Sequence, residues 1–253
     1  MDEQARRAQA FAQAPPGEPV VSVQALTKHF RDVVAVEDVT FSLEAGTVTG
    51  FLGPNGAGKT TTLRLLLGLA RPSEGEALVF GRRYRDLDSP PRRVGAVLES
   101  NDFHPGRSGR DHLRALALAA EIPPSRVEEV LELVELEPVA GRRVKTYSLG
   151  MRQRLGLAGA LLGDPELLIL DEPANGLDPA GVHWLRGFLR DFAEQGRTVL
   201  VSSHILAEVA QTVDQIVIID HGRLLTTATL ADLTERGRTL EQVYLELTGG
   251  GAS

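Results

Sequence analysis

The chain has 253 residues, of which 42% are hydrophobic and 24% are charged, a composition typical of a globular protein and not of a disordered or fibrous one. Its formal net charge of −7 argues against a dedicated nucleic-acid binder, which would usually carry a basic stripe or tail. The chain contains no cysteine, which excludes a disulfide framework and fits a reducing compartment, so we expect a cytoplasmic protein.

The first third of the chain predicts a flexible tail followed by a small sheet. Residues 1–19 lack the cationic start and apolar stretch of a signal peptide, and their Ala, Gln and Pro content is typical of a tail outside the fold. Short β-rich stretches then alternate with charged or glycine-containing turns. We expect strands over residues 20–26, 33–43, 47–52 and 77–81, with a helix over residues 61–70.

The middle and the end of the chain predict helices and then alternating strands and helices. Helical periodicity covers residues 111–121, 126–137 and 151–163, and we interpret residues from about 100 to 162 as an inserted helical subdomain. The alternation after this point is typical of a buried parallel sheet with crossover helices. It predicts strands over residues 167–170, 198–203 and 215–220 and helices over residues 182–196 and 205–213. Residues 221–230 predict a hairpin and residues 231–249 a C-terminal helix, so a main domain over 20–225 precedes a C-terminal helix and tail over 226–253.

A glycine-rich segment between a predicted strand and a predicted helix carries the first chemical signal. It fits the pattern GxxxxGK followed by Ser or Thr, and its residues are Gly53, Pro54, Asn55, Gly56, Ala57, Gly58, Lys59 and Thr60. Such glycines let backbone N–H groups converge on one phosphate, at the positive end of the following helix. Thr61, which follows in that helix, is also a candidate nucleotide-binding residue. Lys59 adds a charge for the β- and γ-phosphates, and the Thr60 hydroxyl suits Mg²⁺. The alternative is a chance glycine-rich turn.

Two adjacent acids form a second signal at the end of the apolar strand predicted over residues 167–170. Beside a phosphate loop such a pair divides the work. Asp171 holds Mg²⁺ through water, and Glu172 orients the attacking water. The alternative for an isolated pair is a solvated acidic strand end.

A third signal is the start of the helix predicted over residues 151–163. Ser148 is a suitable N-cap there, and with Gly150 it offers a second anion site at a helix N-terminus. One chain cannot easily need two helix N-termini for the same γ-phosphate. We therefore interpret this element as serving a nucleotide on another copy of the chain, the alternative being an ordinary capped helix.

Taken together, the ordered motifs resemble those of ATP-binding cassette (ABC) ATPases over residues 20–225. The motifs are the loop from Gly53, the Ser148 element, the Asp171-Glu172 pair, Asn175-Gly176-Leu177-Asp178 and Ser202-Ser203-His204. The resemblance implies an α/β fold: a RecA-like P-loop NTPase core, an antiparallel β subdomain and an inserted helical subdomain. It also implies a head-to-tail homodimer that holds two ATP molecules with Mg²⁺.

The resemblance assigns roles to three further residues. Phe30 matches the aromatic residue that stacks on adenine, although a buried strand-end Phe is the alternative. His204 matches the switch histidine that contacts the γ-phosphate and positions Glu172. Asp178 matches the acid of the loop that crosses the dimer interface, although a local helix cap also explains it.

The sequence departs from the family pattern at three places. Tyr147-Ser148-Leu149-Gly150-Met151 stands where many cassettes carry LSGGQ, and Ala174 where related chains often have Thr. Glu99 stands where many carry Gln, and its carboxylate would add negative charge near the triphosphate while still suiting Mg²⁺ through water. The variant residues resemble ATPase subunits of the bacitracin-resistance and drug-efflux exporters.

The resemblance therefore implies an ATPase subunit, peripheral on the inner face of the membrane, that powers a separate membrane permease exporting drug-like or antibiotic molecules. An importer ATPase is one alternative, because direction belongs to the permease. A soluble ABC switch acting on ribosomes or DNA is another, and the acidic charge argues against it. Among the remaining residues, Trp184 is interpreted as helix packing, and Arg82, Arg83 and Arg85 as a solvated turn.

Overall fold

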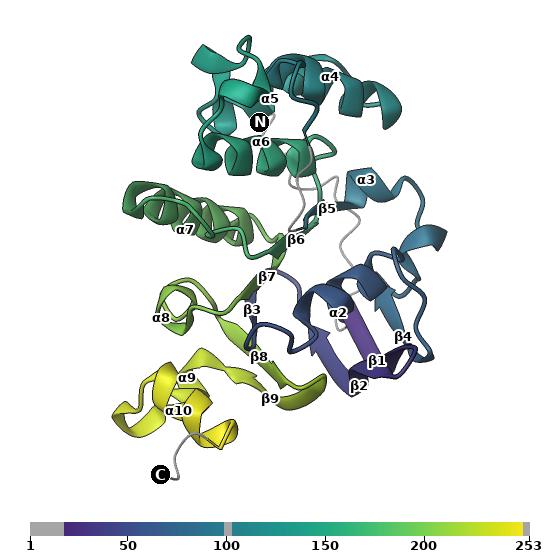
Figure 1. Cartoon of the computed structure of the whole chain (residues 1–253), viewed down its shortest axis with the longest axis vertical. Coiled ribbons are helices and arrows are strands. Elements are labelled where there is room, and N and C mark those ends of the chain that lie inside the picture. Colours follow the sequence, from purple (N-terminus) through teal and green to yellow (C-terminus); the bar gives the residue numbers. More distant parts are fainter. Residues whose placement is uncertain (1–17, 99–102, 250–253) are drawn as a thin grey trace, which may run out of the picture. The chain divides into compact units, whose positions relative to one another are not determined.

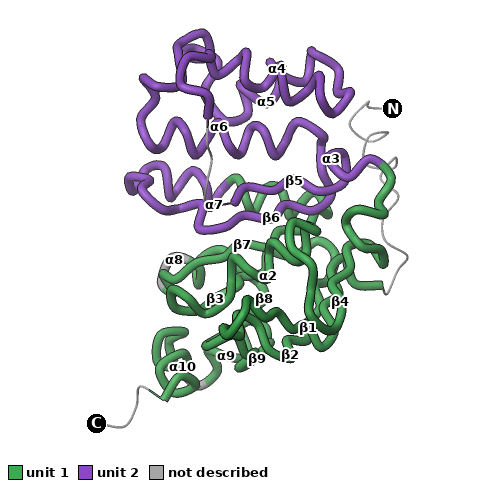
Figure 2. Tube along the Cα trace, turned by 45° about the vertical axis from the view of Figure 1, so that its right-hand side comes forward, with its two compact units in different colours: residues 1–88, 188–253 green, residues 89–187 purple. Residues whose placement is uncertain are grey.

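The computed structural model describes residues 18–98 and 103–249 and divides into two compact units. Unit 1 joins residues up to 88 with residues from 188 onward, and unit 2 comprises residues 89–187 (Figure 2). The predicted tail lies outside the described residues except for its last two positions, and Glu99 lies outside them as well. Within the described ranges, no helix combines the length and the apolar character that crossing a bilayer requires.

The first sheet of unit 1 confirms the predicted antiparallel β subdomain (Figure 1). Its strands, in the order β2-β1-β4, are β1 (Val21–Phe30), β2 (Val33–Leu43) and β4 (Glu74–Val79). The central strand pairs antiparallel with both neighbours, and Val21 lies opposite both Leu43 and Val79. β4 begins three residues before the predicted stretch at 77–81, because Glu74 and Glu76 already pair with β1.

The strands that unit 1 contributes to the second sheet are mostly parallel to one another. Its strands, in the order β7-β3-β8-β9, are β3 (Val48–Leu52), β7 (Thr198–Ser203), β8 (Gln215–Asp220) and β9 (Arg223–Thr229). All residues of β3 and β7 are buried, as expected of strands covered on both faces. Leu52 pairs with both Ser203 and Ile218, so the carboxyl ends of β3, β7 and β8 lie at one edge.

The helices of unit 1 are shorter than the sequence predicts. They are α2 (Lys59–Leu66), α8 (Leu206–Val209), α9 (Leu230–Leu233) and α10 (Leu240–Leu247), with 3₁₀ turns at Tyr84–Asp86 and Glu235–Gly237. The single C-terminal helix predicted over 231–249 is wrong: Gly237 adopts φ 76°, and Thr239 starts a new helix in a capping box with Gln242. The helix predicted over 205–213 shrinks to one turn.

Unit 2 holds two strands and most of the helical residues. Its elements are α3 (Pro90–Arg93), β5 (Val94–Val97), α4 (Gly109–Ala119), α5 (Ser125–Leu133), α6 (Leu149–Leu161), β6 (Leu167–Asp171) and the first part of α7 (Pro179–Glu194), with 3₁₀ turns at Glu137–Val139 and Val144–Thr146. β5 and β6 run parallel, with Val97 opposite Leu170. No strand is predicted from the sequence at β5, which is only four residues long. No helix is predicted at α3, whereas α4, α5, α6 and α7 lie where helical periodicity predicts helices. α4, α5 and α6 bury Leu113, Val130 and Leu155 completely.

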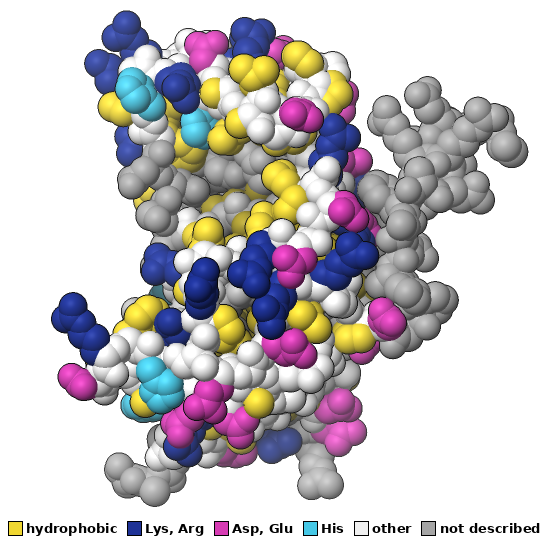
Figure 3. Space-filling model, turned by 90° about the vertical axis from the view of Figure 1, so that its right-hand side faces the viewer, with side chains coloured by type: hydrophobic (Ala, Val, Ile, Leu, Met, Phe, Trp, Pro, Cys, Tyr) yellow, Lys and Arg dark blue, Asp and Glu magenta, His cyan; other side chains and the backbone are white. Residues whose placement is uncertain are grey.

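The surface of unit 1 includes the arginine-rich turn that follows β4. On the face drawn in Figure 3, Lys and Arg side chains lie among Asp and Glu and do not form an unbroken basic stripe. Arg82 forms an ion pair with Asp88 at 3.4 Å, and Arg85 forms one with Asp86 at 3.6 Å. These exposed pairs fit a solvated turn, and each contributes at most about 1 kcal/mol.

Candidate functional site

The glycine-rich loop follows β3 and is held tightly by its neighbours in unit 1. A side chain at Gly53 would overlap the carbonyl oxygen of Ile219, and a Cβ at Gly58 would lie 2.5 Å from the Ala35 carbonyl oxygen. The Gly222 N–H donates to the Ala57 carbonyl at 3.0 Å. The loop is therefore pressed between β2 and the β8–β9 turn, and glycine is required where it touches them.

The end of α2 that faces this loop is open to a ligand. Gly58 is the N-cap with φ 102° and forms no side-chain cap hydrogen bond. Gly56 also has a positive φ, 82°, and a Cβ there would meet nothing within 4 Å. Free space beside the loop and the positive end of a helix are features that a phosphate site needs. The triphosphate site itself stays a prediction.

Lys59 is unusual for a lysine because it is only 6% exposed. Its Nζ donates to the carbonyl oxygens of Gly53 at 2.7 Å and Pro54 at 3.2 Å. These bonds hold the ammonium group within the loop that would receive the phosphates. Thr60 and Thr61 follow in the first turn of α2 and are half-buried.

The acidic pair lies at the end of β6 in unit 2. Asp171 is 3% exposed and Glu172 is 8% exposed, so the alternative of a solvated acidic strand end is wrong. Glu172 adopts a left-handed backbone with φ 50°, which costs a non-glycine residue about 1 kcal/mol. Its carbonyl accepts the Asn175 N–H at 3.1 Å. Backbone strain at a buried acid after a strand is a feature that favours a functional role.

The start of α6 differs from the start of α2 because a side chain caps it. Ser148 is exposed, and its Oγ accepts the Met151 N–H at 3.2 Å. The preceding Tyr147 is buried, and its hydroxyl donates to the Val139 carbonyl at 3.0 Å. Burial raises the pKa of Tyr147, while Arg110 and Arg142 oppose that shift. Tyr147 is therefore in its neutral form, and its hydrogen bond to Val139 anchors the chain directly before the Ser148 cap.

The residues that follow Ser148 pack against the loop before α7. Leu149 contacts Gly176, where any side chain would overlap its Cδ2, and a Cβ at Gly150 would lie 3.4 Å from Leu177. Gly176 has φ 75°, so glycine is needed there for two reasons. The leucine that departs from the family pattern is thus matched by a glycine 27 residues later.

Three other predicted residues occupy exposed positions with defined surroundings. His204 follows β7, and the register of Leu52 with Ser203 places it at the same sheet edge as the phosphate loop. Phe30 is 50% exposed, with the Lys28 Nζ 4.8 Å from its ring centroid, so the alternative of a buried strand-end Phe is wrong. Asp178 accepts the Gly181 N–H at 2.7 Å through Oδ1 and caps α7, as the local alternative for this residue predicts.

A sequence model of the family described as ABC transporter matches residues 36–175, more than half of the chain. The chain belongs to this family. A protein of Bacillus subtilis (strain 168) named "Uncharacterized ABC transporter ATP-binding protein YhcH" is 42% identical over 216 residues, covering 84% of this chain and 71% of that protein. A bacitracin transport ATP-binding protein, BcrA, of Bacillus licheniformis is 40% identical over 230 residues, covering 90% and 74%. A solved structure of an ATP-binding subunit of an ABC transporter has a TM-score of 0.82 and 31% identity, covering 90% of this chain and 99% of that one.

The chain is therefore an ABC transporter ATP-binding protein with the expected P-loop fold. The matched region includes the phosphate loop, the Ser148 element and the Asp171-Glu172 pair, whereas Phe30 and His204 lie outside it. Sequence reasoning missed the residues that brace the loop of this ABC protein, Ala35 and Gly222. Gly222 carried a signal, since a glycine two residues after a strand end often marks a turn or a close backbone approach.

Proposed function

We propose that this chain is the ATP-hydrolysing subunit of an ABC exporter, bound at the cytoplasmic face of the membrane to a separate permease. The observation that carries the proposal is the phosphate loop, with two glycines at positive φ, an uncapped helix start and a buried lysine. Similarity to a bacitracin transport protein over 90% of this chain supports antibiotic molecules as the exported class. An importer is the alternative, because the permease sets the direction of transport.

In the proposed reaction the loop binds the triphosphate of ATP. Backbone N–H groups of the loop and of the first turn of α2, such as those of Gly56, Gly58 and Thr60, surround the phosphates. Lys59 exchanges its carbonyl partners Gly53 and Pro54 for phosphate oxygens. Phe30 stacks on adenine with the ring face that Lys28 leaves open. Charge develops on the γ-phosphoryl group in the transition state, so fixed donors help most at that stage.

The residues proposed for the metal fit Mg²⁺. Thr60 and Asp171 offer hydroxyl and carboxylate oxygens, the ligands that Mg²⁺ prefers, and Glu99 is the third candidate. Within the described part of the chain no three His, Cys, Asp or Glu side chains form a metal cluster, and Mg²⁺ in NTPases takes one or two protein ligands and the substrate phosphates. When bound, the ion neutralises charge on the β- and γ-phosphates.

Hydrolysis is proposed to depend on Glu172 and His204. Glu172 accepts a hydrogen bond from the attacking water and orients it in line with the γ-phosphate. His204 contacts the γ-phosphate and holds Glu172 in position. Glu172 has a left-handed backbone, and its carbonyl accepts the Asn175 N–H, so the backbone that carries this side chain belongs to a hydrogen-bonded turn.

A second copy of the chain is proposed to complete the site. Ser148 and Gly150 of one copy would face the γ-phosphate bound by the other, with Asp178 at the crossing between them. Closure of the homodimer on ATP and its reopening after hydrolysis would then drive the permease, which contacts the chain around Glu99 and the helical subdomain. No nucleic acid takes part.

The test of the proposal is Glu172→Gln in the full chain. We expect ATP binding to persist, turnover to fall by about 10²–10³-fold because the water loses its base, and a stable ATP-bound dimer to accumulate. Steady-state phosphate release and size-exclusion chromatography with ATP measure the two effects.

Glu166→Gln is the matched control. Glu166 precedes the same strand, its side chain is 17% exposed, and it pairs with Arg93 at 2.8 Å. Its loss should lower stability and leave turnover close to wild type. Near-normal hydrolysis in Glu172→Gln would remove Glu172 from its role, and capture of ribosomes or nucleic acid in place of a permease would favour the soluble switch.

A further inference from the structure

Arg154 is the most confined charged side chain near the start of α6. It lies on the second turn of the helix, six residues after Ser148, and its side chain is only 19% exposed. Its Nη1 donates to the Val134 carbonyl at 3.1 Å and also to the carboxylate of Glu135. These bonds tie α6 to the C-terminal end of α5.

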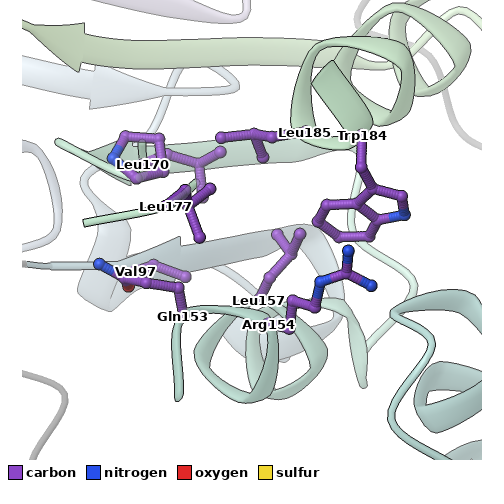
Figure 4. A pocket seen from close by; sticks show the side chains of 9 residues that line it. Val97, Gln153, Arg154, Leu157, Leu170, Leu177, Trp184 and Leu185 are labelled. Carbon is purple, nitrogen blue, oxygen red and sulfur yellow. The ribbon is translucent and has the colours of Figure 1, made fainter. Parts of the chain in front are cut away.

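The same guanidinium faces Trp184 of α7. Its carbon lies 4.2 Å from the centroid of the indole ring, and Figure 4 shows the two groups approaching each other across a narrow slot between the helices. A stack of this kind combines cation–π attraction with a defined orientation, because the guanidinium is planar.

A small slot lies beside this pair, between α6 and the segment that leads into α7. Its free volume is about 20 Å³, and the lining residues besides the pair are Val97, Gln153, Leu157, Leu170, Pro173, Leu177 and Leu185. Gln153 donates through Nε2 to the Asn175 carbonyl at 3.3 Å. Pro173 directly follows Glu172, so the segment from Glu172 to α7 is packed against the second turn of α6.

We propose that Arg154 and Trp184 form a positioning pair that holds the Ser148 end of α6 in register with the Asp178 end of α7. This inference rests on the proposed function, in which both ends face the nucleotide and the surface of the second copy. A small rotation of α6 would move Ser148 and Gly150 away from the geometry that the γ-phosphate needs. Neither Arg154 nor Trp184 touches the nucleotide.

An arginine is a costly choice if the position only fills space. Burying most of its side chain costs conformational entropy and desolvation, and an apolar residue would pack beside Leu157 and Leu185 without these costs. What the guanidinium adds is direction: it bonds to α5 on one side and stacks on α7 on the other. An arginine at position 154 therefore favours one defined orientation of α6 relative to α5 and α7.

The test compares Arg154→Met and Trp184→Leu with Trp184→Phe in the full chain. Met and Leu keep apolar bulk and abolish the stack, whereas Phe keeps an aromatic face. We expect the first two variants to lower kcat about tenfold, since small misplacements of catalytic groups have effects of this order or larger. ATP-driven dimerisation, measured in the Glu172→Gln background, should weaken to a similar extent, while binding of a fluorescent ATP analogue to the monomer stays within about twofold.

Conservative and double variants separate positioning from packing. Trp184→Phe should retain activity and Arg154→Lys should not, because lysine lacks the planar fork. The double variant Arg154→Met/Trp184→Leu should be no slower than the slower single variant, as expected of residues that act as a unit. If Met or Leu variants fail to fold, the Phe and Lys variants decide the question by themselves.

Arg197→Met is the matched control. The guanidinium carbon of Arg197 lies 5.1 Å from the ring centroid of Phe192 in unit 1. It should lower thermal stability without changing kcat or dimerisation. Wild-type kcat and dimerisation in Arg154→Met and Trp184→Leu, with only stability reduced, would overturn the proposal.

Amide hydrogen exchange of residues 149–152 gives a readout that does not depend on catalysis. It should be faster in Arg154→Met and Trp184→Leu and unchanged in Arg197→Met. If the wild-type chain failed to hydrolyse ATP while these exchange rates changed as expected, the proposed function would fail and the pair's effect on α6 would stand. Unchanged hydrogen exchange in Arg154→Met and Trp184→Leu would overturn the proposed positioning role of the pair.

Discussion

The two helix starts that carry the proposed phosphate contacts, those of α2 and α6, solve the same chemical problem in opposite ways. Every helix begins with N–H groups that lack intrahelical partners. At α2 the N-cap is Gly58 at φ 102° with no side-chain bond, whereas at α6 the Ser148 Oγ takes the Met151 N–H. In the proposed function the end at Gly58 receives a ligand, whereas the end at Ser148 is capped by the chain's own side chain.

The surroundings of the two ends differ in the same sense. The loop before α2 is braced by the Ala35 carbonyl and by the Gly222 N–H, so neighbouring backbone groups of the same chain constrain its shape. At α6, Ser148 is exposed and Leu149 is 56% exposed. In the proposed function, α2 provides a binding site within one chain, and α6 presents a surface to a second chain.

The largest effect should come from placing a side chain in the braced loop. Gly58→Ala puts a Cβ 2.5 Å from the Ala35 carbonyl oxygen at a backbone angle that alanine avoids. We expect ATP affinity to fall about 100-fold, because the N–H groups of the loop are displaced. Isothermal titration calorimetry measures this change.

Gly196→Ala is the control for backbone strain alone. Gly196 has φ 81°, and a Cβ added there would meet nothing within 4 Å, so the substitution should cost about 1 kcal/mol of stability and leave ATP affinity unchanged. Wild-type affinity in Gly58→Ala would show that the shape of this loop is not what binds the triphosphate.

A smaller effect is expected at the capped end. Ser148→Ala removes the α6 cap, which should destabilise the fold by about 1 kcal/mol. If Ser148 also donates to a γ-phosphate, kcat should fall by about tenfold, as for loss of one hydrogen bond to a charged group. Chemical denaturation and steady-state kinetics measure the two effects.

Ser108→Ala provides the comparison, because the Ser108 Oγ accepts the Asp111 N–H at 3.1 Å and caps α4 in the same manner. It should lose similar stability and keep its kcat. Equal kinetics in the Ser148 and Ser108 variants would leave Ser148 with the role of an ordinary helix cap.

The smallest effect is expected for Phe30, which is proposed to contact the adenine base of ATP and not its phosphates. Phe30 lies at the end of β1, in the β1–β2 hairpin that also carries Ala35, and half of its surface is open. Phe30→Ala should raise the KM for ATP about fivefold with little change in kcat, because stacking on one base contributes on the order of 1–3 kcal/mol. Phe30→Tyr should keep the wild-type KM. An unchanged KM in Phe30→Ala would mean that adenine is held elsewhere.

Local chemistry explains why much of the fold and site could be predicted. The phosphate loop, the helix after it and the Ser148 cap depend on residues within a few positions of one another, so their spacing identifies them. The C-terminal helix was predicted wrongly because its hydrophobic pattern continues across Gly237, where the backbone turns, and Thr239 caps a new helix. β5 has too few residues to show a period, and its pairing with β6 depends on a strand about 70 residues later.

Short-range residue types are enough to identify the phosphate loop, the acidic pair, the capped helix and the order in which they occur. Three features became visible only in the folded chain: Glu172 is buried in a left-handed turn, Leu149 requires Gly176, and Arg154 stacks on Trp184. These features arise where segments distant in sequence pack at van der Waals contact. The fit of one side chain to another across 27 or 30 residues leaves no period or motif in the sequence, because it depends on how the elements between them fold.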